Sequence, residues 1–95
     1  NLLLEIRKFN SDACVIINLR WDSVVSDILK SMEIIPLVLR REGDNLVVNQ
    51  DVVKTAALVD DGDYGFEPSL YIFGNSPGSV VKIVEELGHS LEIMA

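Results

Sequence analysis

The segment "ACVIINLRWDSVVSDILKSM", residues 13–32, joins a strand pattern directly to a helix pattern. Its first part, residues 13–19, is an almost unbroken apolar and β-branched run, which is typical of a strand that is covered on both faces. In its second part, residues 22–32, apolar side chains recur on one stripe behind a capping residue, Asp22 or Ser23, which predicts an amphipathic helix. We therefore expect residues 13–19 to form a central strand of a sheet with helices on both sides.

Strand patterns and helix patterns alternate along the rest of the chain. The other expected helices are residues 1–9 and 76–88, with residues 48–56 left open between a short helix and extended chain. The other expected strands are residues 34–41, 56–60 and 69–73. Gly88 follows the last apolar stripe and is expected to end its helix. This alternation predicts a single α/β domain over residues 1–95, built in layers around a mixed sheet.

Composition and charge exclude several classes of partner. The chain has 8 basic and 15 acidic residues, and its net charge of −7 repels phosphate backbones and anionic membranes. We therefore expect this segment to make no direct contact with nucleic acid or membrane. Cys14 is the single cysteine, which excludes an internal disulfide and a cysteine-cluster zinc site, and we expect it to be inert core. These features favour an intracellular, cytoplasmic protein.

An acidic, glycine-rich loop precedes the last strand in "VDDGDYGFEPSLYIFG", residues 59–74. Aligning Gly65 with the invariant glycine of an EF-hand puts Gly62 and Tyr64 where acids belong, so no tight metal site is predicted. A plain turn between two strands needs only one Asp-Gly pair. The surplus of glycine suggests instead a backbone that lies close to a ligand, with Glu67 pointed at it. Both readings stay open at this point.

Polar side chains also follow the first strand. Asn18 and Arg20 stand where that strand ends and its helix begins, and ligands of open α/β sheets bind outside the carboxyl ends of strands. Arg20 can hold a phosphate or carboxylate with two donors, but it can equally pair with one of the acids of the surface. Residues 75–79, "NSPGS", can receive a phosphate at a helix N-terminus or simply cap that helix. The residues alone predict a ligand-binding α/β domain.

Three segments together resemble the ThiN family of archaeal-type thiamine-phosphate synthase domains. They are "SDACVIINLRWD" (11–22), "LVLRREGD" (37–44) and "LVDDGDYGFEPSLYIFGNSPGSVVKIVEEL" (58–87). The family pattern has an "A-x-N-I-R-Y" strand end, a basic "D-R" strand end and a final "D-x-G-x-x-G-x-E-P-x-x-x-x-x-G". The positions carried over to this chain are Asn18, Arg20, Arg41, Asp61, Gly62, Gly65, Glu67, Pro68 and Gly74. The resemblance covers nearly the whole chain.

The resemblance implies an α/β/α fold similar to class II aldolases. It also implies an enzyme that joins a hydroxymethylpyrimidine diphosphate to a thiazole phosphate with release of pyrophosphate. Arg20 becomes the best candidate catalytic residue, because loss of a diphosphate needs positive charge aimed at its oxygens. The substrate-binding candidates are Asn18, Arg20, Arg41, Asp61, Gly62, Gly65 and Glu67. We expect Asp61 to face the ligand, and Asp60 and Asp63 to be solvated turn residues. No tightly bound cofactor is expected, and Mg²⁺ enters only with the substrate diphosphate.

Two departures from the family pattern bear on catalysis. Phe66 is apolar where the synthases often carry a basic residue, and a full family domain is considerably longer. We therefore expect the chain to be the C-terminal half of a longer domain that is inactive by itself. A kinase-like domain upstream would indicate the synthase. A helix-turn-helix there would indicate the alternative, a non-catalytic sensor of thiamine phosphate in a transcriptional regulator. The expected partners are phosphorylated thiamine precursors or thiamine phosphate, and a homodimer stays open.

Overall fold

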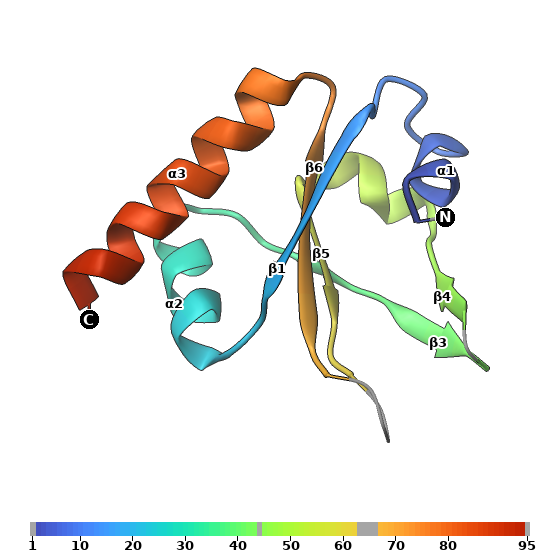
Figure 1. Cartoon of the computed structure of the whole chain (residues 1–95). Coiled ribbons are helices and arrows are strands. Elements are labelled where there is room, and N and C mark those ends of the chain that lie inside the picture. The colour runs from blue at the N-terminus through green and yellow to red at the C-terminus, as the bar shows by residue number, and fades with distance from the viewer. Residues whose placement is uncertain (1, 44, 63–66, 95) are drawn as a thin grey trace.

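The computed structural model describes residues 2–43, 45–62 and 67–94 (Figure 1). Their main sheet has four strands in the order β1 (Val15–Arg20), β6 (Ser69–Gly74), β5 (Ala57–Asp60) and β2 (Leu37–Val38). Strand β6 runs antiparallel to both of its neighbours, whereas β2 and β5 are parallel. The sheet is therefore mixed, as the sequence predicts.

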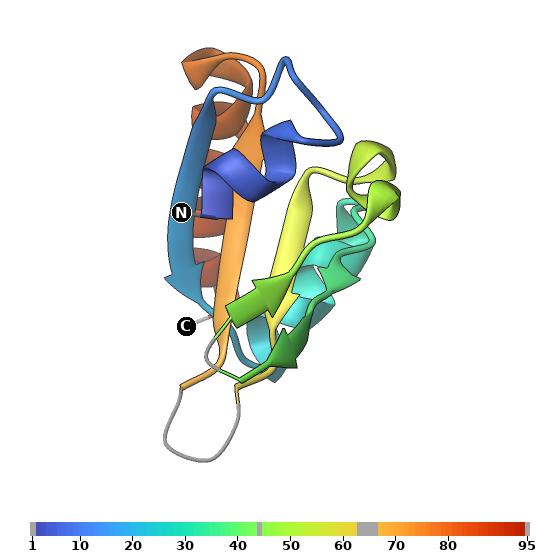
Figure 2. The same ribbon diagram turned by 90° about the vertical axis from the view of Figure 1, so that its right-hand side faces the viewer.

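Other elements cover both faces of this sheet (Figure 2). The helices α2 (Ser23–Ser31) and α3 (Pro77–Met94) pack on one face. The other face carries α1 (Leu2–Arg7), the 3-10 helix η1 (Gln50–Lys54) and a separate hairpin of β3 (Arg40–Glu42) and β4 (Asn45–Val47). The prediction of a layered α/β domain is confirmed.

Two apolar clusters, one on each face, hold these layers together. Strand alternation sends Val59 and Ile72 toward α2 and α3, and it sends Leu58 and Phe73 toward α1 and η1. Strand β5 lies between two neighbours, and all four of its residues are buried. The core of the domain is thus centred on β5 and β6.

Helix α2 has an identifiable start and an identifiable stop. Asp22 is its N-cap, and the Asp22 side chain accepts a hydrogen bond from the N–H of Val25 at 2.9 Å. At the other end the N–H of Ile34 donates to the Leu29 carbonyl oxygen at 3.0 Å. Glu33 takes a φ of +61° to allow this, a conformation that usually falls to glycine. The helix therefore ends in a Schellman-type turn without a glycine.

Strand β1 lies at one end of the strand order, so within the described residues it pairs along one edge alone. The prediction of a central strand is wrong. Ile16 and Ile17 are apolar because both faces of the strand are covered, which says nothing about its two edges. Cys14 precedes the strand, and its exposed thiol donates to the carbonyl oxygen of Asn75 at 3.1 Å. The expectation that Cys14 is core is wrong as well.

Two further elements differ from the prediction in extent. The segment left open between helix and extended chain contains the 3-10 helix η1. Helix α3 continues through Gly88 to Met94, so Gly88 does not end it. No helix in the described part of the chain is both long and apolar enough to cross a membrane.

Candidate functional site

A row of polar side chains crosses three strands at one end of the face that carries α1 and the hairpin. Arg20 of β1 lies opposite Ser69 of β6, and Ser69 lies opposite Asp60 of β5. Two residues further along the strands, Asn18 lies opposite Tyr71. Because neighbouring strands are about 4.8 Å apart, the Cα atoms of Arg20 and Asp60 are separated by about 10 Å. Asn18 and Arg20 therefore lie at the same end of the sheet as the two ends of the acidic loop.

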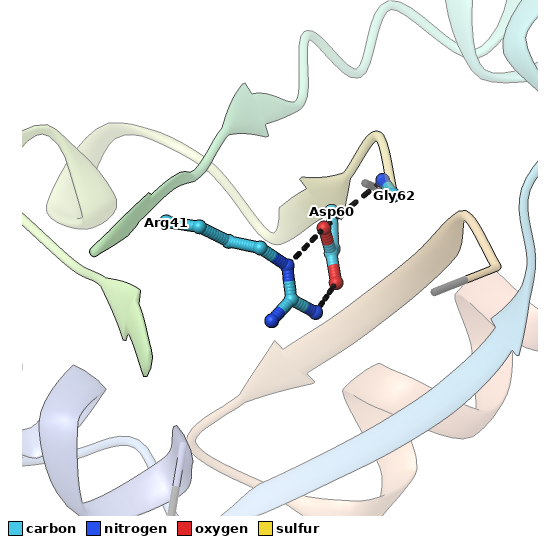
Figure 3. Close-up of polar contacts among 3 residues, drawn as sticks. All are labelled: Arg41, Asp60 and Gly62. Atoms are coloured by element: carbon cyan, nitrogen blue, oxygen red, sulfur yellow. Dashed lines mark hydrogen bonds and ion pairs between the residues drawn. The ribbon is translucent and has the colours of Figure 1, made fainter. Parts of the chain in front are cut away.

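Arg41 reaches the same place from β3, outside the main sheet (Figure 3). Its Nε donates to Asp60 Oδ1 at 3.3 Å, and its Nη2 donates to Asp60 Oδ2 at 2.5 Å. The side chains of Arg41 and Asp60 are 15% and 5% exposed, so this ion pair is largely withdrawn from water. The N–H of Gly62 donates a third hydrogen bond, to Asp60 Oδ1 at 3.0 Å. One carboxylate thus binds both the hairpin and the start of the loop.

Asp60 is not a solvated turn residue, and this prediction is wrong. It is the last residue of β5 and is buried on the same side of the strand as Leu58. The family pattern contained the signal, because "D-x-G" counted back from Gly62 puts its acid at residue 60 and not at residue 61. Asp61 is exposed, and its role in ligand binding stays a prediction. The same holds for Arg41, whose ion pair with Asp60 the sequence did not indicate.

Arg20 is oriented by the start of α2. Its Nε lies 3.0 Å from Asp22 Oδ2, while the other oxygen of Asp22 caps the helix. The Arg20 side chain is nevertheless 78% exposed, so its positive charge is presented to solvent at the end of β1. Asn18 is also exposed. Of the two readings of Arg20, pairing with an acid is observed, and contact with a ligand stays a prediction.

The loop between β5 and β6 begins and ends at this row of side chains. Gly62 has a φ of +82°, which glycine adopts without strain at the first turn of the loop. Glu67 is exposed just before β6 begins. Predicted contacts at Gly65, and the interpretations of Asp63, Tyr64 and Phe66, lie outside the described residues. Ser69 and Tyr71 were not predicted, although a period of two from Glu67 along the strand would have found both.

Residues 75–79, the other predicted phosphate position, lie at the opposite end of β6 from this site. The Oγ of Ser76 accepts the N–H of Ser79 at 3.2 Å, which is a side-chain cap of α3. Capping of α3 is therefore a sufficient reason for a serine at position 76, and no ligand is needed to explain it.

Within the described residues, the side chains of the site are not arranged to hold a metal ion by themselves. Among the described residues, no three His, Cys, Asp or Glu side chains gather as ligands for an ion. Both oxygens of Asp60 already accept hydrogen bonds from Arg41 and Gly62. Mg²⁺ binds commonly through one or two carboxylates together with substrate phosphates and water. No step of the chemistry below is therefore assigned to a resident metal.

Comparison with known proteins gives one family and two solved structures. The sequence model described as thiamine-phosphate synthase ThiN matches residues 1–86. The crystal structure of the C-terminal domain of protein MJ0236 matches 99% of this chain with a TM-score of 0.77 and 20% identity. The C-terminal domain of phosphomethylpyrimidine kinase matches 90% of it with a TM-score of 0.69 and 16% identity. At such identities the two structures show a shared fold. The chain spans 57% of the length of each solved chain. No curated protein matches it.

Proposed function

Because this chain belongs to the ThiN family of thiamine-phosphate synthases, we propose that it binds phosphorylated thiamine precursors at the polar end of its sheet. One observation carries the proposal: Asn18 and Arg20 of β1 lie at the same end of the main sheet as Asp60 and Ser69, between which the acidic loop runs. Ligand sites of α/β sheets lie outside the carboxyl ends of strands, and β1 and β5 both end here.

The proposed reaction joins a hydroxymethylpyrimidine diphosphate to a thiazole phosphate. A bond forms between the thiazole nitrogen and the pyrimidine methylene carbon, and the bond from that carbon to the diphosphate oxygen breaks. The electron pair leaves with pyrophosphate, so negative charge grows on the leaving oxygens. Preorganised cationic donors aimed at such oxygens lower the barrier. We assign this role to Arg20, whose guanidinium is held by Asp22 and remains largely exposed.

The remaining predicted residues would orient the two substrates. Asn18 and Asp61 are exposed and offer an amide and a carboxylate to the heterocycles, and Glu67 offers a second carboxylate from the far end of the loop. Gly62, at the first turn of the loop, brings its backbone to the same end of the sheet. In this proposal Arg41 acts beside the loop through its guanidinium, which Asp60 holds in place.

The rest of the proposed context follows from the family. The similarity to a phosphomethylpyrimidine kinase domain supports a kinase fused upstream, with this chain as the C-terminal half of a longer domain. Mg²⁺ would arrive with the diphosphate, and a class II aldolase-like arrangement, a homodimer and a cytoplasmic location belong to the same proposal. The alternative is a sensor that binds thiamine phosphate without turning it over.

Calorimetry and a pyrophosphate assay test the function on the intact longer domain, in which the proposed upstream half is joined to this chain. Thiamine phosphate should bind more tightly than thiamine, and Arg20→Ala should remove that preference. Arg40→Ala is the matched control, because Arg40 is 73% exposed and also pairs with a carboxylate two residues on, Glu42, but comes from the hairpin. Pyrophosphate released from the two substrates supports the synthase, and binding without release supports the sensor. If thiamine phosphate and thiamine bind equally, or neither binds, the proposal is wrong.

A further inference from the structure

We propose that Asp60 is a positioning residue of this site, which fixes the β3–β4 hairpin and the ligand loop relative to each other. The inference rests on the proposed function for the identity of the ligand. The hydrogen bonds of Asp60 to Arg41 and Gly62, which we call the clamp, are a property of the ligand-free chain. Asp60 does not touch the ligand in this account. Its side chain is 5% exposed, and both of its oxygens accept hydrogen bonds from the protein.

The hairpin needs such a tie because it leaves the main sheet. Leu39 is the last residue before it that bonds to β5, through its N–H to the Val59 carbonyl oxygen at 2.8 Å. From Arg40 on, β3 pairs with β4 alone among the strands described. Arg41, two residues beyond Leu39, then reaches back to the end of β5. The bidentate ion pair therefore sets how far β3 stands from the sheet at the edge of the site.

The loop needs the same carboxylate for a different reason. Asp60 is the last residue of β5, so the direction in which the chain leaves the strand is decided within the next two residues. The hydrogen bond from the N–H of Gly62 to Asp60 Oδ1 fixes that direction, and the positive φ of Gly62 completes the turn. The exposed Asp61 lies inside this turn. Its position at the site therefore depends on Asp60.

A carboxylate buried only for stability would not need this arrangement. Replacing a buried ion pair by apolar residues of the same volume is often neutral or stabilising, so the pair is weak support for a stabilising role. Positioning makes a different demand, because a shift of one element by about 1 Å is enough to weaken a site severely. Three donors from two separate chain segments converge on Asp60, and this geometry points to positioning.

The test compares Asp60→Ala, which removes both acceptor oxygens, with a control two residues before the same strand begins. Thr55 is that control, since its Oγ1 donates to the Ile35 carbonyl oxygen at 2.8 Å and accepts the N–H of Ala57 at 3.1 Å. Thr55→Val removes these polar contacts at nearly constant volume. Two quantities are measured in each variant: the amide exchange rate of Gly62 relative to Leu70, and the affinity for thiamine phosphate.

We expect Asp60→Ala to speed exchange at Gly62 by about 10-fold or more and to weaken binding by about 10- to 100-fold, the range for one lost hydrogen bond to a charged group. Thr55→Val should lower the melting temperature and change neither quantity. Arg41→Gln should weaken binding to a similar degree, and the double variant with Asp60→Ala should be no worse than the stronger single one.

Unchanged exchange at Gly62 in Asp60→Ala overturns the inference, as does Thr55→Val reproducing both effects. If Asp60→Ala fails to fold, Arg41→Lys decides, because lysine keeps the charge but lacks the guanidinium fork. It should give intermediate exchange at Gly62, and exchange equal to that of the unsubstituted chain would refute positioning. If the unsubstituted chain binds no thiamine phosphate, the proposed function fails, and the exchange rates alone then support or overturn the clamp.

Discussion

Replacing Gly74 by alanine should destabilise the domain, because the added methyl group would lie too close to neighbouring side chains. Gly74 ends β6 where the chain turns into α3. A Cβ added there would lie 3.0 Å from Val80 Cγ2 and 3.1 Å from Ser79 Oγ. Val80 is fully buried in the core between the sheet and the helices, so its methyl group has little room to withdraw.

The size of the effect follows from two opposing terms. Carbon atoms in contact prefer about 3.5–4.0 Å, and forcing an extra methyl group into a packed core typically costs about 1–3 kcal/mol. Alanine also restricts the unfolded chain, which returns about 0.4–1 kcal/mol. The net loss in the free energy of unfolding should then lie within about 0–2.6 kcal/mol, with a midpoint of about 1.3 kcal/mol. For a domain of this size, each kcal/mol lowers the melting temperature by about 4–8 °C.

Thermal and urea unfolding of Gly74→Ala and Gly88→Ala form the assay. At Gly88, in the middle of α3, an added Cβ meets no atom within 4 Å, so alanine should stabilise the helix by about 1 kcal/mol. Gly74→Ala should therefore lower the free energy of unfolding, and Gly88→Ala should raise it. Adding Val80→Ala to Gly74→Ala removes the clashing methyl group, and the double variant should be less destabilised than the sum of the single ones. Additive losses, or a Gly74→Ala variant as stable as the parent, would refute the packing explanation.

Three further predictions concern the ligand, a helix end and metal. Arg20→Ala should weaken the binding of thiamine phosphate by roughly 1.5–3 kcal/mol in calorimetry, the range for hydrogen bonds to a charged group, and unchanged affinity would remove Arg20 from the site. Glu33→Gly should raise the free energy of unfolding by about 1 kcal/mol in urea titrations, because Glu33 holds a φ of +61°, and a loss would contradict this. Mg²⁺ and Ca²⁺ without ligand should cause only weak, salt-like shifts of the Asp61 and Gly62 amides, and tight saturable shifts would make the loop a metal site.

Much of this fold could be predicted because the elements carry local signals. The capping Asp22 and the apolar stripe behind it give α2, and the alternation of apolar runs and helix patterns gives the layered mixed sheet. The position of β1 in the sheet could not be predicted in this way. Its apolar residues report what covers the faces of the strand, whereas strand order depends on pairing between distant segments.

In the candidate site, too, the residues with local signals could be predicted, and the contact between distant segments could not. Asn18 and Arg20 were found because they lie at the end of a strand, and the loop was found from its glycines. The burial of Asp60 was missed, because a carboxylate next to Asp61 and Gly62 looks like turn chemistry until its partner is known. That partner, Arg41, is 19 residues away and reaches Asp60 only through the fold of the hairpin. Ion pairs between distant segments leave no periodic trace in a sequence.

The position of β1 at the rim of the sheet has a consequence for handling this protein. Such a strand offers a row of backbone N–H and C=O groups to any extended peptide that approaches it. Residues 15–19, "VIINL", have no charge and no proline to discourage this, and only Arg20 closes the strand with a cation. Growth of the sheet by a strand from another chain is therefore open at this rim. Preparations of the chain at high concentration should associate here first.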